Sequence, residues 1–172
     1  YNLAISSLLK DTIMNFGLVY LDDLILMSPN FEHHLDLLSR VFDKFRGANL
    51  RFNPNKSSFA LDRVKYLGLI VSKDGLYIDD SRVDVIRSFP PPTDQRSIKQ
   101  FVGMCSFFRR FVKNFSTIAW PLRKLLTKNV KFEWGPEQQS AFDQLKLALS
   151  SGPVLMFPDP NKRFYLACDA SK

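Results

Sequence analysis

Two adjacent carboxylates interrupt the longest apolar stretch of the chain, residues 16–27. Asp22 and Asp23 are costly in such a context unless they lie at a turn, are paired, or bind cations. Residues 18–21 and 24–27 on either side are rich in Val, Ile, Leu and Tyr, which predicts the two strands of a β-hairpin. Two interpretations of the acidic pair remain open. It is either an ordinary Asp-Asp β-turn, or a pair of oxygen ligands that a rigid hairpin holds for Mg²⁺.

The composition is that of a globular protein, because 45% of the 172 residues are apolar and 24% are charged. Disorder is excluded on this basis, and no apolar run reaches the roughly 18 residues that a transmembrane helix needs. No secretory signal pattern opens the chain, and two cysteines are too few for a disulfide framework. We therefore expect a protein that is not secreted and does not bind membranes. Since the first residue is Tyr1, we also expect a piece of a longer product.

The net charge of the whole chain is +7, and the positive charge is concentrated in its second half. Residues 1–80 carry nine Lys and Arg against ten Asp and Glu, whereas residues 81–172 carry fifteen against seven. Within that half, residues 95–132 hold nine bases and no acid. Such asymmetry favours a polyanionic partner, and a basic face that merely contacts solvent is the alternative.

Hydrophobic spacing predicts a mixed α+β fold. Helices are expected where apolar residues recur every three or four positions, and strands where short β-branched and aromatic runs end at turn residues. The expected helices are residues 3–14, 31–45, 81–89, 94–113, 116–126 and a segment that begins at 136. The expected strands, besides the hairpin, are residues 50–52, 64–71, 76–78 and 164–168. The run Pro90-Pro91-Pro92 predicts a boundary between modules.

The helix expected over residues 94–113 has an apolar face and a basic face. Its bases Arg96, Lys99, Arg110 and Lys113 lie largely opposite the apolar residues, where they could meet phosphates. The run Phe107-Phe108-Arg109-Arg110-Phe111 could stack on bases, because aromatic residues next to Arg suit nucleic acid. Helical spacing instead favours the core for Phe108 and Phe111.

Three further residues receive structural interpretations. His33 and His34 have no further Cys or His at ligand spacing, so a surface pair at a helix start is favoured over a metal site. Cys105 lies on an apolar helix face and is expected to be a small core residue.

The sequence Tyr20-Leu21-Asp22-Asp23 and its apolar flanks, Val19 and Leu24-Ile25-Leu26, resemble the active-site hairpin of reverse transcriptases. Further short motifs follow in an order that resembles the Pol polyprotein of gypsy-type long-terminal-repeat retrotransposons over nearly the whole chain. These motifs are His34-Leu35, Leu50-Arg51-Phe52-Asn53-Pro54-Asn55-Lys56, Val64-Lys65-Tyr66-Leu67-Gly68, Phe101-Val102-Gly103, Phe107-Phe108-Arg109-Arg110-Phe111, Asn114-Phe115-Ser116, Ile118-Ala119, Pro121-Leu122, Phe132-Glu133-Trp134, Ala141-Phe142, Leu145-Lys146, Pro153-Val154-Leu155 and Asp169-Ala170-Ser171.

The resemblance implies a division of the α+β fold into three parts. Residues 1–80 would be the C-terminal part of a polymerase palm, with antiparallel active-site and primer-grip hairpins and their helices. Residues 81–126 would be a helical, basic thumb. Residues 127–172 would be a connection that leads into the first strand of a truncated ribonuclease H-like domain.

The resemblance also implies roles for individual residues. The catalytic, metal-binding carboxylates would be Asp22 and Asp23 in the palm and Asp169 in the ribonuclease H-like part. Tyr20 and Leu21 would lie beside the primer terminus and the nascent base pair, and Tyr66, Leu67 and Gly68 would grip the primer. The residues expected to contact the nucleic-acid backbone are Arg96, Lys99, Arg109, Arg110 and Lys113.

The implied function is RNA-directed DNA polymerisation, in which a nucleotide is transferred to a primer 3′-hydroxyl with two Mg²⁺ ions. The implied partners are an RNA or DNA template with primer, deoxynucleoside triphosphates and the remainder of the Pol polyprotein, within a cytoplasmic particle or the nucleus. The family carries another catalytic aspartate on an earlier strand, and in residues 1–16 the lone carboxylate is Asp11, on an expected helix without that motif. We therefore expect the fragment to be inactive in isolation. A nucleic-acid-binding remnant without catalysis is the alternative.

Overall fold

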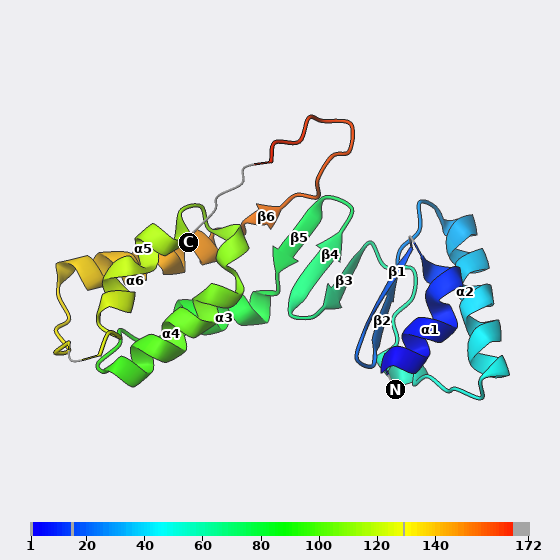
Figure 1. Cartoon of the computed structure of the whole chain (residues 1–172), viewed down its shortest axis with the longest axis horizontal. Helices are drawn as coiled ribbons and strands as arrows, with labels where there is room; N and C mark the ends of the chain where they lie inside the picture. The colour runs from blue at the N-terminus through cyan, green and yellow to red at the C-terminus, as the bar shows by residue number, and fades with distance from the viewer. Residues whose placement is uncertain (1, 15, 129, 167–172) are drawn as a thin grey trace, which may run out of the picture. The chain divides into compact units, whose positions relative to one another are not determined.

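Figure 1 shows the computed structural model, which describes residues 2–14, 16–128 and 130–166. The chain forms two compact units, residues 1–67 and 68–172. The three-part division at residues 80 and 126 stays a prediction, because a boundary between compact units need not coincide with a boundary between functional parts. No helix of the described residues is long and apolar enough to cross a membrane.

The first unit places a two-stranded hairpin against two helices. In chain order its elements are α1 (Asn2–Ile13), β1 (Gly17–Tyr20), β2 (Asp23–Leu26), α2 (Phe31–Gly47), the 3₁₀ helix η1 (Pro54–Lys56) and β3 (Arg63–Tyr66). Side chains of α1 and α2 form the buried core, which consists of Ile5, Leu9, Ile13, Leu37 and Val41. Val19, Leu24 and Leu26 of the hairpin pack against this core. The apolar segments around the acidic pair are therefore strands, as predicted, and one hairpin face is anchored on helices.

Helix α2 begins where capping side chains satisfy its first backbone groups. The Asn30 side chain accepts a hydrogen bond from the His33 backbone N–H at 2.9 Å. The His34 ring is hydrogen-bonded to the Ser28 hydroxyl at 3.0 Å. Both histidines thus take part in local contacts at the start of a helix, which agrees with the structural interpretation of this pair.

The strand expected over residues 50–52 is absent, and that prediction was wrong. Phe52 lies in an irregular segment and stacks on Phe42 of α2, with ring centroids 5.1 Å apart. Phe59 contacts both rings edge-on. Aromatic packing onto a helix, rather than pairing with a strand, holds this segment in place.

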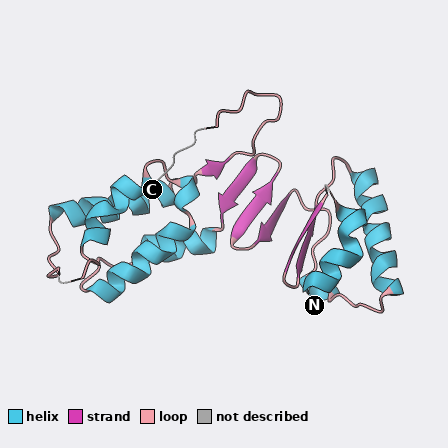
Figure 2. Ribbon diagram, viewed as in Figure 1, coloured by secondary structure: helices cyan, strands magenta, loops and turns pink. Residues whose placement is uncertain are grey.

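The second unit combines a small antiparallel sheet with five helical segments. Its strands are β4 (Leu69–Ser72), β5 (Gly75–Ile78) and β6 (Val154–Leu155), with β5 between the other two. The helical segments are α3 (Asp80–Ser88), α4 (Gln95–Phe107), η2 (Arg109–Phe111), α5 (Phe115–Lys124) and α6 (Pro136–Ser150). Figure 2 shows these helices gathered beside the strands. Phe101, Leu122, Phe142, Leu145 and Leu149 are fully buried at the centre of their core.

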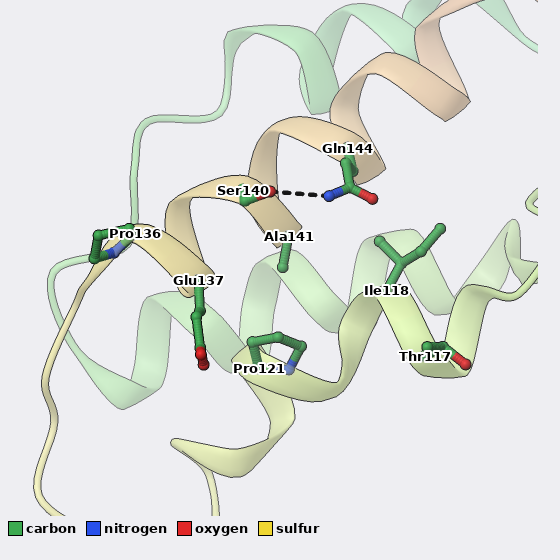
Figure 3. A pocket seen from close by; sticks show the side chains of 8 residues that line it. All are labelled: Thr117, Ile118, Pro121, Pro136, Glu137, Ser140, Ala141 and Gln144. Carbon is green, nitrogen blue, oxygen red and sulfur yellow. Dashed lines mark hydrogen bonds between the residues drawn. The ribbon is translucent and has the colours of Figure 1, made fainter.

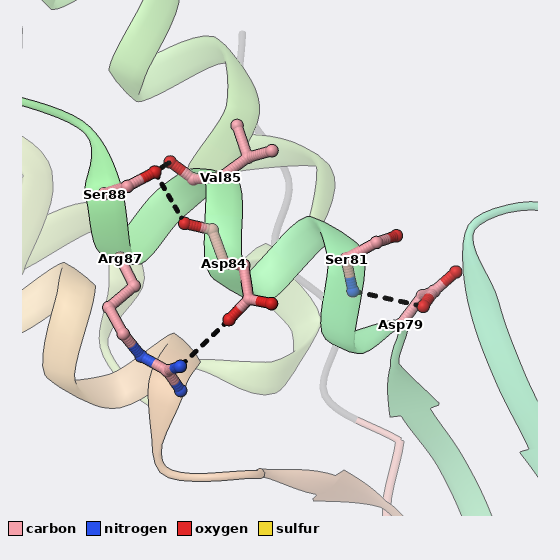
Figure 4. Close-up of polar contacts among 6 residues, drawn as sticks. All are labelled: Asp79, Ser81, Asp84, Val85, Arg87 and Ser88. Carbon is pink, nitrogen blue, oxygen red and sulfur yellow. Dashed lines mark hydrogen bonds and ion pairs between the residues drawn. The ribbon is translucent and has the colours of Figure 1, made fainter.

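Helix α3 is a short helix that local polar contacts define at both ends (Figure 4). The Asp79 carboxylate accepts from the Ser81 backbone N–H at 3.2 Å, which caps the first turn. Near the other end, the Ser88 hydroxyl donates to the Asp84 carbonyl at 2.8 Å. The proline run follows, and the Lys146 ammonium of α6 donates to the Phe89 carbonyl just before it at 2.9 Å.

Two elements predicted as continuous are divided. The strand expected over residues 64–71 is interrupted by Leu67 and Gly68, whose φ values of 51° and 77° are left-handed and end an extended strand. The helix expected over residues 94–113 ends at Phe107 and continues as the separate 3₁₀ helix η2. Asn114, with φ of 58°, then starts α5. The tighter and reversed backbone lets Phe108, Val112 and Phe115 all enter the core.

The last expected strand, residues 164–168, is not formed in the part that the structure describes. Residues 164–166 are irregular and exposed, and residues 167 and 168 lie outside the described residues. A strand needs a hydrogen-bonded neighbour, and β5 pairs instead with β4 and with β6, a two-residue strand that sequence spacing did not predict.

The core of the second unit predicts a sharp difference between two leucines of α6. Leu145 is fully buried, whereas Leu147 is 72% exposed. Leu145→Ala should lower the free energy of unfolding by about 2–5 kcal/mol, because it leaves a cavity. Leu147→Ala should change it by no more than about 0.5 kcal/mol. Urea denaturation followed by Trp fluorescence measures both, since the two Trp residues, Trp120 and Trp134, lie in this unit. Equal losses would contradict the described core.

Candidate functional site

The acidic pair lies at a two-residue hairpin turn. Tyr20 and Asp23 form the last paired position of β1 and β2, so Leu21 and Asp22 make the connection. Leu21 has a φ of 55°, in the left-handed region that Gly or Asn adopts more readily than a bulky residue. The turn is therefore strained, and it holds Asp22 at the tip and Asp23 at the first position of β2.

Both carboxylates face solvent. Asp22 and Asp23 are exposed, and neither side-chain carboxylate takes part in a hydrogen bond or ion pair within the described residues. Tyr20 and Leu21 beside them are 51% and 56% exposed. The hairpin thus presents two ionisable oxygen groups and two large side chains on its outer surface, while its inner residues are anchored in the core.

Tyr66, at the end of β3, interacts electrostatically with two residues of this hairpin. Partial burial raises the pKa of the Tyr66 phenol, and the negative charges of Asp23 and of ionised Tyr20 raise the pKa further. Tyr20, Asp23 and Tyr66 are thus brought into one region of the first unit. Leu67, which follows, is 41% exposed and left-handed in backbone conformation.

The oxygen groups fit a hard divalent cation in kind but are too few to enclose one. Carboxylates are the ligands that Mg²⁺ prefers. Among the described residues, no group of three or more His, Cys, Asp or Glu side chains could hold a metal ion. Asp169, which the resemblance assigns to the separate ribonuclease H-like part and not to this hairpin, lies outside the described residues. Asp22 and Asp23 are therefore two candidate ligands of an incomplete set.

The five predicted phosphate-contacting residues are all exposed but do not share one helical face. Arg96 and Lys99 lie on α4, Arg109 and Arg110 lie on η2, and Lys113 precedes α5. The prediction that four of them, Arg96, Lys99, Arg110 and Lys113, share one face of a single helix was wrong, because the backbone tightens after Phe107 to bury Phe108 and its neighbours. Only the pair Arg96 and Lys99 shares a regular helix surface.

The exposed face of α4 contains Gln100 and Gly103, to which sequence reasoning assigned no role, and Phe107, which belongs to the run considered for base stacking. Gln100, Gly103 and Phe107 are exposed and follow Arg96 at intervals of four, seven and eleven positions, which places them on one stripe. Phe107 is 65% exposed, whereas Phe108 is buried. A Cβ atom added to Gly103 would meet no heavy atom within 4 Å. This stripe becomes identifiable once the helix is known to end at Phe107, because the longer predicted helix has a basic face that continues to Arg110 and Lys113.

A separate open pocket lies between α5 and α6 (Figure 3). Its volume is about 490 Å³, and its lining residues are Thr117, Ile118, Pro121, Pro136, Glu137, Ser140, Ala141 and Gln144. The Gln144 amide donates to the Ser140 hydroxyl at 2.9 Å, one turn earlier on the same helix α6. Glu137 is the lone ionisable residue of the lining, so the pocket lacks the paired groups that acid–base or metal chemistry requires.

Cys105 behaves as the sequence predicts. The side chain is buried in the core of the second unit, and burial raises the pKa of its thiol to about 12. A thiol that stays protonated is a poor nucleophile, so this residue belongs to the core rather than to a reactive site.

Two protein families match the chain. The family described as reverse transcriptase (RNA-dependent DNA polymerase) matches residues 1–71. The family described as an RNase H-like domain found in reverse transcriptase matches residues 134–172. Reverse transcriptases generally use divalent metal ions.

Curated relatives match nearly the whole chain but are much longer. The Retrovirus-related Pol polyprotein from transposon 412 of Drosophila melanogaster is 41% identical over 154 residues, which are 90% of this chain and 12% of the relative. The polyprotein from transposon gypsy of the same organism is 33% identical, over 98% of this chain and 17% of the relative. The Transposon Tf2-3 polyprotein of Schizosaccharomyces pombe is 30% identical, over 97% of this chain and 12% of the relative.

Solved structures share the fold, which confirms the predicted α+β class. A foamy viral protease-reverse transcriptase in complex with double-stranded DNA superimposes with a TM-score of 0.84 at 24% identity, over 94% of this chain and 28% of that chain. The foamy viral enzyme in complex with an RNA/DNA hybrid gives a TM-score of 0.78 at 25% identity, over 90% of this chain and 21% of that chain. The chain therefore belongs to the reverse transcriptase family, as a segment of a retrotransposon Pol polyprotein that includes an RNase H-like region.

Proposed function

We propose that this chain carries the catalytic hairpin of an RNA-directed DNA polymerase. The observation that carries the proposal is the turn itself, where a left-handed Leu21 holds two exposed carboxylates without a partner among the described residues. An ordinary Asp-Asp turn would favour Gly or Asn at such a position. Strain that persists in a hairpin anchored on a core is typical of functional sites.

The reaction would be transfer of a nucleotide from a deoxynucleoside triphosphate to a primer 3′-hydroxyl. Asp22 and Asp23 would hold divalent cations, for which Mg²⁺ is the best match to carboxylate ligands. When bound, two such cations supply Lewis-acid activation of the hydroxyl and neutralise charge on the leaving pyrophosphate. The chain's own contribution is to fix both carboxylates on a rigid turn before substrate arrives.

Neighbouring residues would orient the primer. Tyr20 and Leu21 expose large side chains beside the carboxylates, where a primer terminus and a nascent base pair would pack. Tyr66, whose pKa responds to Asp23, would contact the primer together with Leu67 and Gly68. Asp169 would serve the ribonuclease H-like part. These assignments correspond to a palm over residues 1–80, a thumb over 81–126 and a connection with the start of the ribonuclease H-like domain over 127–172.

The exposed face of α4 would hold the nucleic acid. Arg96 and Lys99 place two cations on its first turns, and the foamy viral neighbours are described in complex with double-stranded DNA and with an RNA/DNA hybrid. Gly103 costs about 1 kcal/mol in a helix relative to Ala, and no atom of the chain occupies the space of a Cβ there. A partner that approaches the bare backbone would account for this residue, with Phe107 next to it.

Arg109, Arg110 and Lys113 would extend the phosphate contacts beyond α4. The template would be RNA or DNA, and the remainder of the Pol polyprotein would supply the rest of the polymerase. The place of action would be a cytoplasmic particle or the nucleus. A nucleic-acid-binding remnant without catalysis is the second candidate, which the incomplete carboxylate set of the described residues favours.

The incomplete carboxylate set predicts that the 172-residue chain alone does not extend a primer. Two carboxylates at one turn leave each divalent cation with too few ligands for an in-line displacement. Purified chain, a primed RNA template, Mg²⁺ and deoxynucleoside triphosphates should give no extended product. Template-dependent incorporation by the chain would show that two carboxylates suffice and would contradict this prediction.

The basic face predicts salt-dependent binding of an RNA/DNA hybrid. Arg96→Gln combined with Lys99→Gln should make the slope of log K against log salt shallower by about 1.8, since each lost phosphate contact removes about 0.9. The matched control is Arg40→Gln with Lys44→Gln on α2, which changes the net charge equally and should leave the slope unchanged. Fluorescence anisotropy at several salt concentrations measures the slope.

Gly103→Ala provides an independent arm of the same titration. It should raise helix stability by up to about 1 kcal/mol and yet weaken binding, because the new methyl group blocks close approach. If both double variants reduce the slope equally, or if Gly103→Ala binds as well as the original chain, α4 is not the interface.

A further inference from the structure

A second feature of the structure is the pairing of strand β6 with the sheet. Within the described residues, this pairing is the last strand contact before the chain continues toward the ribonuclease H-like end. Strand β6 pairs antiparallel with β5, with Leu155 opposite Leu76 and Val154 opposite Tyr77. After β6, residues 156–166 are all exposed, and Figure 1 shows this segment leaving the sheet as a long loop. Its recorded contacts are local ones around Asp159 and Lys162.

Gly75 makes this pairing possible. It is the first residue of β5 and has a φ of 137°, which L side chains rarely adopt. A Cβ atom placed on Gly75 would lie 2.6 Å from the Leu155 carbonyl oxygen and 3.1 Å from a Val154 methyl carbon. No other residue type fits here without displacement of β6. The bare backbone at position 75 therefore sets how closely β6 approaches the sheet.

The turn that presents Gly75 is itself fixed. The buried Ser72 hydroxyl accepts a hydrogen bond from the Asp74 backbone N–H at 3.1 Å and donates to the Gly75 carbonyl at 3.3 Å. Strand β4 pairs with β5 through Ser72 opposite Gly75. Gly75 is thus held by its own hairpin before β6 is added, and it acts as a rigid contact point rather than a flexible one.

This contact lies between a strand that closely follows one family-matched region and a strand inside the other. The reverse transcriptase match ends at residue 71, just before Gly75, and β6 lies within the RNase H-like match over residues 134–172. Strand β6 ends fourteen residues before Asp169, the proposed first carboxylate of the ribonuclease H-like part. The pairing therefore determines where the segment that leads toward this carboxylate leaves the sheet.

We propose that Gly75 is a positioning residue that sets the distance between RNA cleavage and the primer terminus, a proposal that rests on the proposed function. With β6 paired, the free segment starts at residue 156; with β6 released, it starts after α6 at residue 151. The five added residues extend its reach by up to about 17 Å. Because successive nucleotides of one strand are about 3.4 Å apart, this added reach would let the cleavage position vary over roughly five nucleotides.

The first test uses the 172-residue chain and amide hydrogen exchange. Gly75→Ala should raise exchange at residues 154–155 and at the facing edge of β5 by at least tenfold, without change in α4 and α6. Gly152→Ala is the matched control, because Gly152 also has positive φ, at 69°, precedes the same strand and would crowd no atom within 4 Å. It should leave exchange in β6 unchanged. Unchanged exchange in Gly75→Ala would overturn the proposed contact.

The second test measures the position of the RNA cuts relative to the primer terminus. A residue with a merely structural role would not change this position. The chain is completed with the flanking residues of the transposon 412 polyprotein and given an end-labelled RNA hybridised to a DNA primer. Gly75→Ala should extend the primer within twofold of the original rate but spread the RNA cuts over up to about five more nucleotides. Gly152→Ala should give the original cleavage pattern.

The outcomes separate the proposal from the function on which it rests. No extension by the unaltered completed protein would contradict the proposed function. Normal extension with an unchanged cleavage pattern, despite faster exchange in β6, would contradict the positioning role alone. If Gly75→Ala fails to fold, Val154→Gly with Leu155→Gly weakens the same pairing without the clash, because Val154 is 42% exposed at the sheet edge. An original cleavage pattern in that variant would equally refute the role.

Discussion

The left-handed backbone at Leu21 is the constraint on which the candidate active site depends. The left-handed residue lets a connection of only two residues reverse the chain between β1 and β2. Asp22 then lies at the tip of the turn, and Asp23 starts the second strand. The strain persists because Val19, Leu24 and Leu26 are packed on the core of α1 and α2. Without that anchor, two adjacent carboxylates would have no reason to keep a fixed geometry in water. The fold thus holds the charges in place before any cation or substrate is present.

Much of this fold follows from local sequence rules, and the failures have identifiable causes. The hairpin around Asp22 and helix α2 were predicted because apolar spacing and turn residues act locally. The prediction of one long helix over residues 94–113 was wrong because Phe108, Val112 and Phe115 are all buried in the same core. A 3₁₀ segment allows this, whereas a continuous α-helix does not. The strand predicted over residues 50–52 is absent because Phe52 stacks on the Phe42 ring and does not pair with another strand. Strand β6 depends on a contact with Gly75, 80 positions away, which no local pattern encodes.

The candidate sites divide in the same way. Asp22 and Asp23 are visible in the sequence because charge interrupts an apolar run, and Arg96 and Lys99 because bases gather without acids. Gly103 and Phe107 are visible only when the helix bounds are known, since exposure on a defined face gives a bare backbone and an unburied ring their meaning. Gly75 needs the tertiary structure itself. Chemistry-bearing residues were therefore easier to predict than the glycines that control approach.

The most direct test of the catalytic assignment is primer extension by the chain completed with the preceding residues of the transposon 412 polyprotein. Asn keeps the shape of Asp but removes the charge that would hold cations, so Asp22→Asn and Asp23→Asn should each slow extension at least a hundredfold, about 2.7 kcal/mol of barrier. Asp11→Asn, an equal change at an exposed position of α1, should have little effect. Losses below about tenfold for both hairpin variants, or an equal loss in Asp11→Asn, would contradict the assignment and leave the pair an ordinary turn.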